Sequence, residues 1–304
     1  MNSQRQVTTT IDAERCIGCG ACVRVCPKET LSMQDEKAVV SGDTSLNCGH
    51  CAAACPTGAI TVAALAPQLN HFRTFTTDEG WLAYGDSDTG KLVRLMRSRR
   101  SCRNFSQKPV SRDHLEDLIR IGITAPSGSN CQLWTFTVLP SRAAVLALAE
   151  RIAAFFQRLN ALAQKAWLRC LLKLCGKPSL ADYHRDHFQT VARALNQWQE
   201  TGCDRLFHGA PAALVVGCKK RASCPAEDAL LATGQILLAA HSMGLGTCLI
   251  GFAIEAMRHD PTIVRALSIP DDERPYAVIA IGWPTESYQT VCGRKPIEVR
   301  YAEG

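Results

Sequence analysis

The sequence predicts an α+β protein made of a small cysteine-rich module and a larger domain in which helices flank a central sheet. Two observations lead to this prediction. A run of cysteines near the N-terminus is repeated, and further along the chain short apolar segments alternate with amphipathic helical patterns. With 304 residues, of which 46% are hydrophobic and 20% charged, the chain is long and apolar enough to pack a core in its larger domain.

The N-terminal module carries one cysteine spacing twice. The first copy consists of Cys16, Cys19, Cys22, Cys26 and Pro27. The second copy, 29 residues later, consists of Ser45, Cys48, Cys51, Cys55 and Pro56. Bacterial ferredoxins use this spacing to hold two iron–sulfur clusters, and the fourth cysteine of each run binds the other cluster. The module is therefore expected to carry electrons one at a time.

The crossover predicts a 4Fe-4S cluster on Cys16, Cys19, Cys22 and Cys55, and a second cluster on Cys26, Cys48 and Cys51. At the eighth position Ser45 leaves three outcomes open. Its oxygen could bind a 4Fe-4S cluster, the site could hold a 3Fe-4S cluster, or water or another group could fill the place. Because an alkoxide is a harder ligand than a thiolate, we expect an altered or labile second cluster.

Zinc is the competing interpretation, since Cys-x-x-Cys pairs also bind zinc. Zinc would leave the third cysteine of each run and the Cys-Pro endings unexplained, so iron–sulfur clusters are favoured. So small a module buries little core, and we expect metal binding to supply most of its folding free energy.

The module is expected to span residues 1–66, and a linker to span 67–90, ending in the turn-rich stretch Gly85–Gly90. The larger domain then spans 91–304. Within it, residues 142–204 have a helical pattern dense in large side chains and are expected to form an insertion or lid.

Composition and charge limit the classes of binding partner and the cellular location that we expect. A net charge of +6 without a continuous basic face makes nucleic acid a poor candidate. The polar stretch Met1–Thr10 does not resemble a signal peptide, and the remaining cysteines have no disulfide framework, so a cytoplasmic location is expected. The most apolar stretch, Ala229–Ile254, contains Gln235 and His241, and we expect a buried helix there rather than a membrane span.

The larger domain begins with a predicted helix over 91–97, followed by a dense basic run. The run contains Arg99, Arg100 and Arg103, with Ser101 between them. Its spacing is equally compatible with a solvated helix end and with a phosphate clamp of guanidinium groups and a hydroxyl. Ser111 is expected to cap a second helix, and the loop over 125–134 to lead into a strand over 135–139.

The remaining elements follow from periodicity and glycine placement. Residues 212–217 and 276–282 are short, apolar and bounded by Pro and Gly, which predicts buried strands. Residues 228–242 predict a long apolar helix that ends at Gly244. Glycines at the end of a helix argue against a Rossmann dinucleotide site, which needs them between a strand and the start of a helix.

Three motifs resemble the nitroreductase family of FMN enzymes. They are Arg99-Arg100-Ser101-x-Arg103-x-Phe105, Ala125-Pro126-Ser127-Gly128-x-Asn130-x-Gln132, and Gly244-Leu245-Gly246-Thr247 with Gly251. Together with the cysteine module, the whole chain resembles a ferredoxin–nitroreductase fusion.

The resemblance implies an FMN site in a homodimer formed through the flavin domain. Arg99, Arg100, Ser101 and Arg103 would contact the phosphate and ribityl chain. The other subunit would line the flavin with Pro126, Ser127, Gly128, Asn130 and Gln132. Leu249, Ile250 and Gly251 would place a backbone N–H, around Ile250, against flavin N5. A basic pair near the C-terminus, Arg294 and Lys295, would reach the phosphate.

The expected function is reduction of a small acceptor, such as a nitro-aromatic, a quinone or an enone, by FMN. Electrons would come through the iron–sulfur module from an external ferredoxin or flavodoxin, from NAD(P)H, or from both. The alternative is a redox sensor or electron-transfer adaptor without a dedicated substrate. The flavin carries the chemistry, so no catalytic side chain is assigned, and Tyr183, His184, His187 and His208 receive no role.

Overall fold

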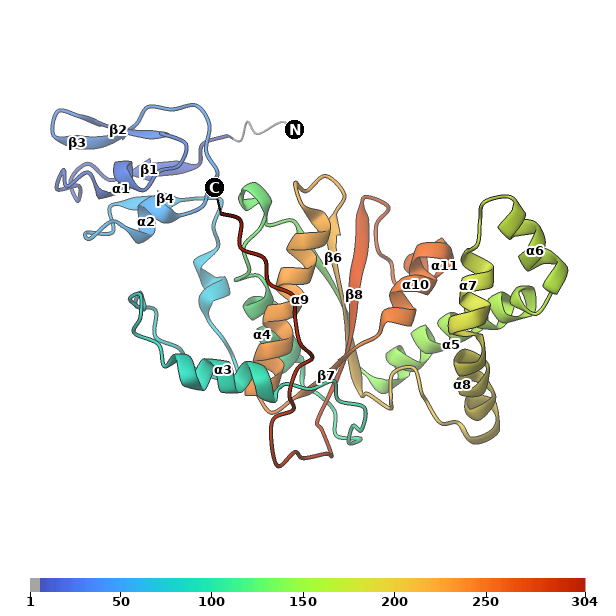
Figure 1. Ribbon diagram of the computed structural model, residues 1–304. Helices are drawn as coiled ribbons and strands as arrows, with labels where there is room; N and C mark the ends of the chain where they lie inside the picture. The colour runs from blue at the N-terminus through green and yellow to red at the C-terminus, as the bar shows by residue number, and fades with distance from the viewer. Residues whose placement is uncertain (1–5, 304) are drawn as a thin grey trace.

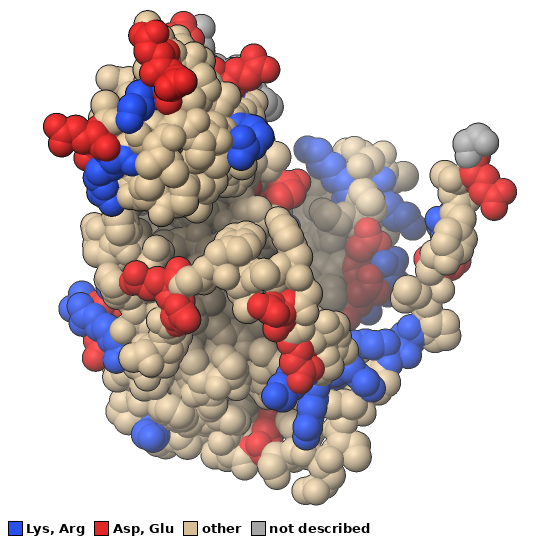
Figure 2. Space-filling view, turned by 90° about the vertical axis from the view of Figure 1, so that its left-hand side faces the viewer, with Lys and Arg blue, Asp and Glu red and all other residues tan. Residues whose placement is uncertain are grey.

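The computed structural model describes residues 6–303 and shows two domains, the small module lying at one end of a larger helix-and-sheet domain (Figure 1). The predicted α+β class is confirmed. From residue 283 to 303 the C-terminal segment has no regular structure and stands off the body of the larger domain (Figure 2).

The module is a duplicated unit of loop, short helix and strand. Its two-stranded pairs are β1 (Thr9–Ile11) with β4 (Ile60–Val62), and β2 (Leu31–Gln34) with β3 (Lys37–Val40). The helices α1 (Ala21–Arg24) and α2 (His50–Ala53) have four residues each, and each starts after a glycine with a left-handed backbone, Gly20 (φ 67°) and Gly49 (φ 78°). The two glycines are 29 residues apart, as the repeated cysteine spacing requires.

The central sheet of the larger domain is antiparallel in the order β5-β6-β8-β7. Its strands are β5 (Trp134–Leu139), β6 (Ala212–Lys219), β7 (Gly246–Leu249) and β8 (Glu273–Gly282). Successive side chains of a strand point to opposite faces. In β6, Leu214 and Val216 therefore belong to one buried core and Ala213 and Val215 to the other.

Helices cover both faces of the sheet. The face toward Leu214 packs on α4 (Arg112–Gly122) and α9 (Pro225–Ser242), and the opposite face packs on α5 (Arg142–Ala163) and α10 (Gly251–His259), which α11 (Pro261–Ala266) follows. This arrangement of a central sheet with flanking helices is visible in Figure 1. The helix α3 (Thr89–Ser98) lies outside α9 and contributes no buried residue.

The segment 142–204 is helical, as expected. It forms α5, α6 (Ala166–Leu174), α7 (Ser179–Asp186) and α8 (Phe188–Thr201), and α6 to α8 make a lobe at the far end of the molecule from the module (Figure 1).

Two capping predictions are confirmed. The Ser111 hydroxyl accepts a hydrogen bond from the His114 N–H at the start of α4, and Gly244 adopts a left-handed conformation (φ 78°) just after α9. The expectation of one buried helix over Ala229–Ile254 is wrong, because the chain turns at Gly244 and continues as β7 and then α10. None of the helices among residues 6–303 has the length and apolar character needed to cross a membrane.

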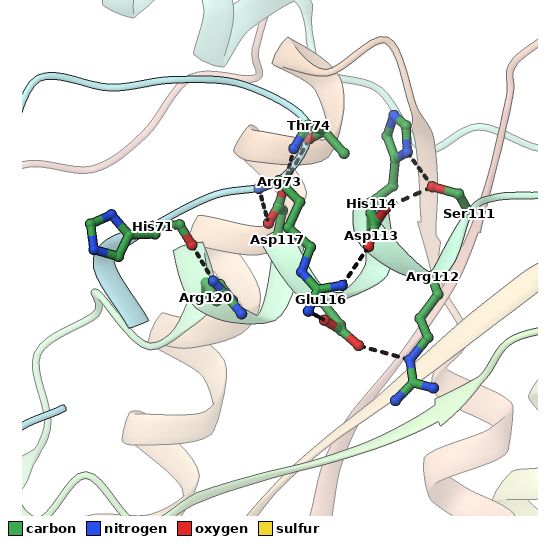
Figure 3. Close-up of polar contacts among 10 residues, drawn as sticks. All are labelled: His71, Arg73, Thr74, Ser111, Arg112, Asp113, His114, Glu116, Asp117 and Arg120. Atoms are coloured by element: carbon green, nitrogen blue, oxygen red, sulfur yellow. Dashed lines mark hydrogen bonds and ion pairs between the residues drawn. The ribbon is translucent and has the colours of Figure 1, made fainter. Parts of the chain in front are cut away.

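The connection between the domains consists of residues 63–88, with a single 3₁₀ turn, η1 (Pro67–Asn70). The expected linker, 67–90, overlaps this segment and the first two residues of α3. Residues 71–74 do not hang free, because they are hydrogen-bonded to α4 (Figure 3).

Candidate redox site

The structure gathers the cysteines of the module around two cavities. One is lined by Cys16, Cys19, Cys22 and Cys55, and the other by Cys26, Cys48, Cys51 and Ser45. Each cavity thus takes its fourth position from the other copy of the repeat, which is the crossover expected from the spacing. These side chains fit two iron–sulfur clusters, each bound by thiolates from both halves of the module.

Backbone N–H groups are directed at the cysteine sulfurs. The Ala59 N–H donates to Cys55 Sγ (3.2 Å) and the Thr30 N–H donates to Cys26 Sγ (3.4 Å). Burial raises the pKa of Cys26, but hydrogen bonds from Lys28 and Thr30 outweigh it and hold the pKa below its usual value. Hydrogen bonds that stabilise a thiolate also stabilise its charge as a metal ligand.

Ser45 lies in the second cavity and is 9% exposed. Its Oγ accepts a hydrogen bond from the Asn47 N–H at 3.0 Å. The hydroxyl therefore occupies the position of the missing cysteine and is held there by the loop that leads to Cys48.

Four arginines form a cluster at the edge of the sheet beyond β7, which we call the cation cluster: Arg99, Arg100, Arg103 and Arg294. Burial lowers the pKa of Arg99, and the charges of Arg100 and Arg294 lower it further. Arg99 and Arg103 both lie near Cys248: burial raises the pKa of this thiol, and the charges of Arg103 and Arg99 partly oppose that rise. Among residues 6–303, none of the four arginines forms an ion pair with a carboxylate. Cations gathered without acidic partners suit a bound anion such as a phosphate.

Backbone pairing fixes the position of the basic run. Ser101 forms a parallel bridge with Thr247 of β7, and the Cys102 N–H donates to the Thr247 carbonyl at 2.9 Å. The Gly246 backbone lies so close to Cys102 that an added Cβ would lie 2.8 Å from its side chain. A glycine at this position therefore leaves room for the Cys102 side chain against β7. Lys295 follows Arg294 in an exposed segment without regular structure.

The turn from β7 into α10 corrects one expectation. The N–H of Ile250 donates to the Val278 carbonyl at 2.8 Å, so it is already used within the sheet and is not available to a flavin. The N–H groups of Gly251 and Phe252 lie in the first turn of α10 and have no partner within that helix. Leu249 and Gly251 are exposed at this turn, whereas Ile250 is buried.

A large open cavity of about 1020 Å³ begins at this turn. Arg103, Cys248 and Gly251 lie at one side, and the helical segment 142–204 provides aromatic side chains at the other, including Phe155, Phe156 and Tyr183. The volume is at the upper end of the range for ligand pockets. Burial, and then the charge of Arg103, lower the pKa of His208 at the cavity wall, which favours a neutral imidazole there at neutral pH.

The 125–132 loop lies at the other edge of the sheet, just before β5. The Gly128 N–H donates to Asp228 Oδ1 (2.8 Å), and the Gln132 N–H donates to Ser127 Oγ (3.0 Å). Gln132 Nε2 donates to Asn130 Oδ1 (2.9 Å). Pro126 is exposed at the start of the loop. The structure therefore brings the five loop residues together, but apart from the cation cluster.

Asp228 was missed by reasoning from sequence. It is buried in the first turn of α9, and its carbonyl also accepts a hydrogen bond from Trp134 Nε1 (3.0 Å). The other carboxylate oxygen, Oδ2, is buried without a hydrogen-bond partner among the described residues. An acid at the start of an apolar helix is an ordinary sequence feature, and its contact with Gly128, a hundred residues away, leaves no local signal.

Comparison with known proteins gives separate matches for the module and for the larger domain. The nitroreductase family profile matches residues 96–283, which is more than half of the sequence. The chain belongs to the nitroreductase family. Residues 15–59 match the 4Fe-4S dicluster domain, which decides for iron–sulfur clusters over zinc. The expected fusion of an iron–sulfur module with a nitroreductase-family domain is therefore confirmed, and the protein is an oxidoreductase.

The relatives of this nitroreductase-family chain include a deiodinase and a nitroreductase. It is 25% identical over 207 residues to an iodotyrosine deiodinase of Haliscomenobacter hydrossis, covering 66% of this chain and 82% of the relative. It is 26% identical over 215 residues to a chloronitrobenzene nitroreductase of Comamonas testosteroni, covering 64% and 86%. A nitroreductase structure with bound FMN from Desulfitobacterium hafniense is 21% identical, with a TM-score of 0.49, covering 69% of this chain and 97% of that one.

Proposed function

We propose that this chain is an FMN-dependent reductase of small conjugated acceptors that receives electrons through its own dicluster module. The observation that carries the proposal is the cation cluster beside β7, from which Arg103 also reaches the wall of the large cavity. The arginines would hold the FMN phosphate, and the first turn of α10 would face the isoalloxazine ring with its N–H groups. FMN supplies the exchange between single electrons and electron pairs.

The cavity supports an aromatic or quinone-like acceptor. Phe155, Phe156, Tyr183 and Phe252 surround it, and planar side chains pack well on planar substrates. The relatives named after chloronitrobenzene and iodotyrosine act, by their names, on aromatic compounds, which agrees with this choice.

We propose that the enzyme works as a homodimer. The cation cluster borders β7 and the 125–132 loop precedes β5, so three strand spacings, about 14 Å, separate the two halves of the FMN site. A second copy would bring its loop to the cation cluster of the first.

Exposed apolar surface supports this assembly. Leu92, Val93 and Met96 of α3 are each more than 40% exposed. In the C-terminal segment Ile297, Val299 and Tyr301 are also exposed, and the segment stands off the body of the molecule in Figure 2. Apolar surface of this kind on a helix and a detached segment is typical of a subunit interface.

The test uses cluster-replete, FMN-loaded protein. Anaerobic turnover would be measured with a panel of nitro-aromatics, quinones and enones, using reduced ferredoxin, NADH or NADPH as donor. Turnover with at least one donor is expected, with loss in a variant lacking Cys48 and Cys51 when ferredoxin is the donor. No turnover with any donor, in protein that binds FMN and iron, would favour a redox sensor or adaptor instead.

A further inference from the structure

Hydrogen bonds from Asn130 of the larger domain reach the module. Asn130 Nδ2 donates to the backbone carbonyls of Leu46 (3.0 Å) and Asn47 (3.3 Å). These two residues lie between Ser45 and Cys48, so it is the Ser45 half of the module that touches the 125–132 loop. Leu46 and Asn47 also line the cavity of Cys26, Cys48 and Cys51, whereas neither lines the cavity of Cys16, Cys19 and Cys22.

Both sides of this contact have unusual backbone conformations. Asn47 has a φ of 48°, and Ser129, Asn130 and Gln132 have φ values of 52°, 51° and 50°. Side chains other than glycine rarely adopt this left-handed region, and such strain is retained where surrounding contacts hold it. Here the Ser45 hydroxyl holds Asn47, and the Gln132 amide holds the side chain of Asn130 so that Nδ2 faces the module.

The connecting segment that follows the module is itself hydrogen-bonded to α4, as Figure 3 shows. The buried carboxylate of Asp117 on α4 accepts hydrogen bonds from the Arg73 N–H (3.0 Å) and from the Thr74 N–H and hydroxyl (2.7 Å each). The guanidinium of Arg73 pairs with Asp113 at 2.9 Å, and Arg120 donates to the His71 carbonyl. A module held at both places has a defined position on its own chain rather than a tethered, mobile one.

The docked loop cannot serve the cation cluster of the same chain, because the two lie at opposite edges of the sheet. We propose that the Ser45 half of the module, positioned by Asn130, serves the flavin held by the cation cluster of the other subunit. Each module thus delivers electrons to the flavin held by the other chain of the dimer. This inference depends on the proposed function and adds which flavin each module feeds.

Mixed dimers separate this arrangement from delivery within one chain. In the first dimer, one chain carries Arg99→Ala and Arg103→Ala, and the other carries Cys48→Ala and Cys51→Ala. Flavin remains only at the intact cation cluster of the second chain, next to the loop and intact module of the first. In the reciprocal dimer, all four substitutions are on one chain and the other is wild type, so the remaining flavin lies next to a defective module.

The readout is bleaching of flavin absorbance after mixing with reduced ferredoxin. Two equivalents of ferredoxin are oxidised for each FMN reduced by two electrons, and water supplies the protons. We expect wild-type rates per flavin in the first dimer and only background in the reciprocal one, with background set by the Cys48→Ala, Cys51→Ala homodimer. The opposite pattern, equal rates in both, or background in both would overturn the proposal. Absence of FMN or of acceptor turnover in the wild type would instead contradict the proposed function.

A single substitution tests Asn130 as a positioning residue. Asn130→Asp keeps the size of the side chain but removes the Nδ2 donor to Leu46 and Asn47. Because misplacement by about 1 Å can cost about 100-fold in rate, flavin reduction by ferredoxin should slow at least tenfold. Because Asn130 also belongs to the loop expected to line the flavin, the ferredoxin rate is expressed per bound FMN and divided by the rate with dithionite, a small reductant that bypasses the module, measured in the same variant. This ratio should fall at least tenfold. Gln107→Ala, an exposed substitution outside the contact, is the control. An unchanged ratio in Asn130→Asp would remove Asn130 from the docking contact.

Discussion

Replacing Arg99 with Gln is expected to weaken FMN binding and, at the same time, to stabilise the protein without FMN. The folded protein disfavours the Arg99 charge, because burial, Arg100 and Arg294 all lower its pKa. Without a bound anion these positive charges only repel one another. Gln keeps part of the aliphatic stem, so the packing changes little while the charge is removed.

The two effects have different sizes. A hydrogen bond to a charged group contributes about 1.5–3 kcal/mol, so the dissociation constant for FMN should rise about 10- to 150-fold. Pairs of partly exposed charges contribute about 0.2–1 kcal/mol. Relief of one repulsive pair should therefore raise the melting temperature of the FMN-free protein by about 0.5–4 °C.

FMN titration by fluorescence quenching and thermal unfolding of the FMN-free protein measure the two effects. The control is Arg112→Gln, since Arg112 is exposed on α4 and pairs with Glu116 at 2.8 Å. This control should leave FMN affinity unchanged and should not raise the melting temperature. An Arg99 variant with unchanged FMN affinity and a lower melting temperature would refute the assignment of Arg99 to an anion site. The gain in stability should also shrink at high salt, which screens the repulsion.

Three further outcomes are expected. Ser45→Cys should raise the iron content and give the second cluster a conventional EPR signal, and an unchanged iron count would show that the missing thiolate is not the only difference. Asp117→Ala should make residues 63–88 more sensitive to protease and lower stability by about 1–3 kcal/mol. Although burial opposes ionisation of Asp117, hydrogen bonds from Thr74 and Arg73 hold its pKa below the unfolded value near 3.9. The stabilisation by this carboxylate is therefore fully present above about pH 5 and is lost as pH falls below about 4, as acid unfolding of wild type and variant would reveal. Met96→Asp on α3 should shift the protein from dimer to monomer in sedimentation, and an unchanged dimer would exclude this face from the interface.

Metal chemistry explains why the module was predictable from sequence. Cluster ligands must recur at fixed spacings, so the repeat alone predicted the fourth position of each cavity, including Cys26 and Cys55. Strands and helices of the larger domain were also predictable, because both faces of β6 and β8 are buried and the apolar runs have clear ends.

Local sequence was less informative about which backbone groups are free. The family resemblance placed an N–H around Ile250 against the flavin, but the residues around Ile250 gave no information on whether that N–H is free. That group is used by β8, whose Val278 carbonyl lies 28 residues further along the chain. The availability of an N–H depends on strand pairing over such separations, and no local pattern reports it.

The conformation of the connecting segment also depends on a residue distant in the sequence, Asp117. The turn-rich end of this segment predicted only a linker, yet Arg73 and Thr74 are the hydrogen-bond partners of a carboxylate with no exposed surface. A buried carboxylate is costly unless its oxygens are hydrogen-bonded, so α4 can bury Asp117 only when this segment is in place. Large apolar side chains of the segment, such as Trp81, Leu82 and Tyr84, are exposed and do not hold it on the larger domain. The segment supplies the hydrogen-bond donors that Asp117 needs, and Asp117 holds the segment on α4. The larger domain therefore begins before α3, and this attachment and the Asn130 contact together hold the module on it.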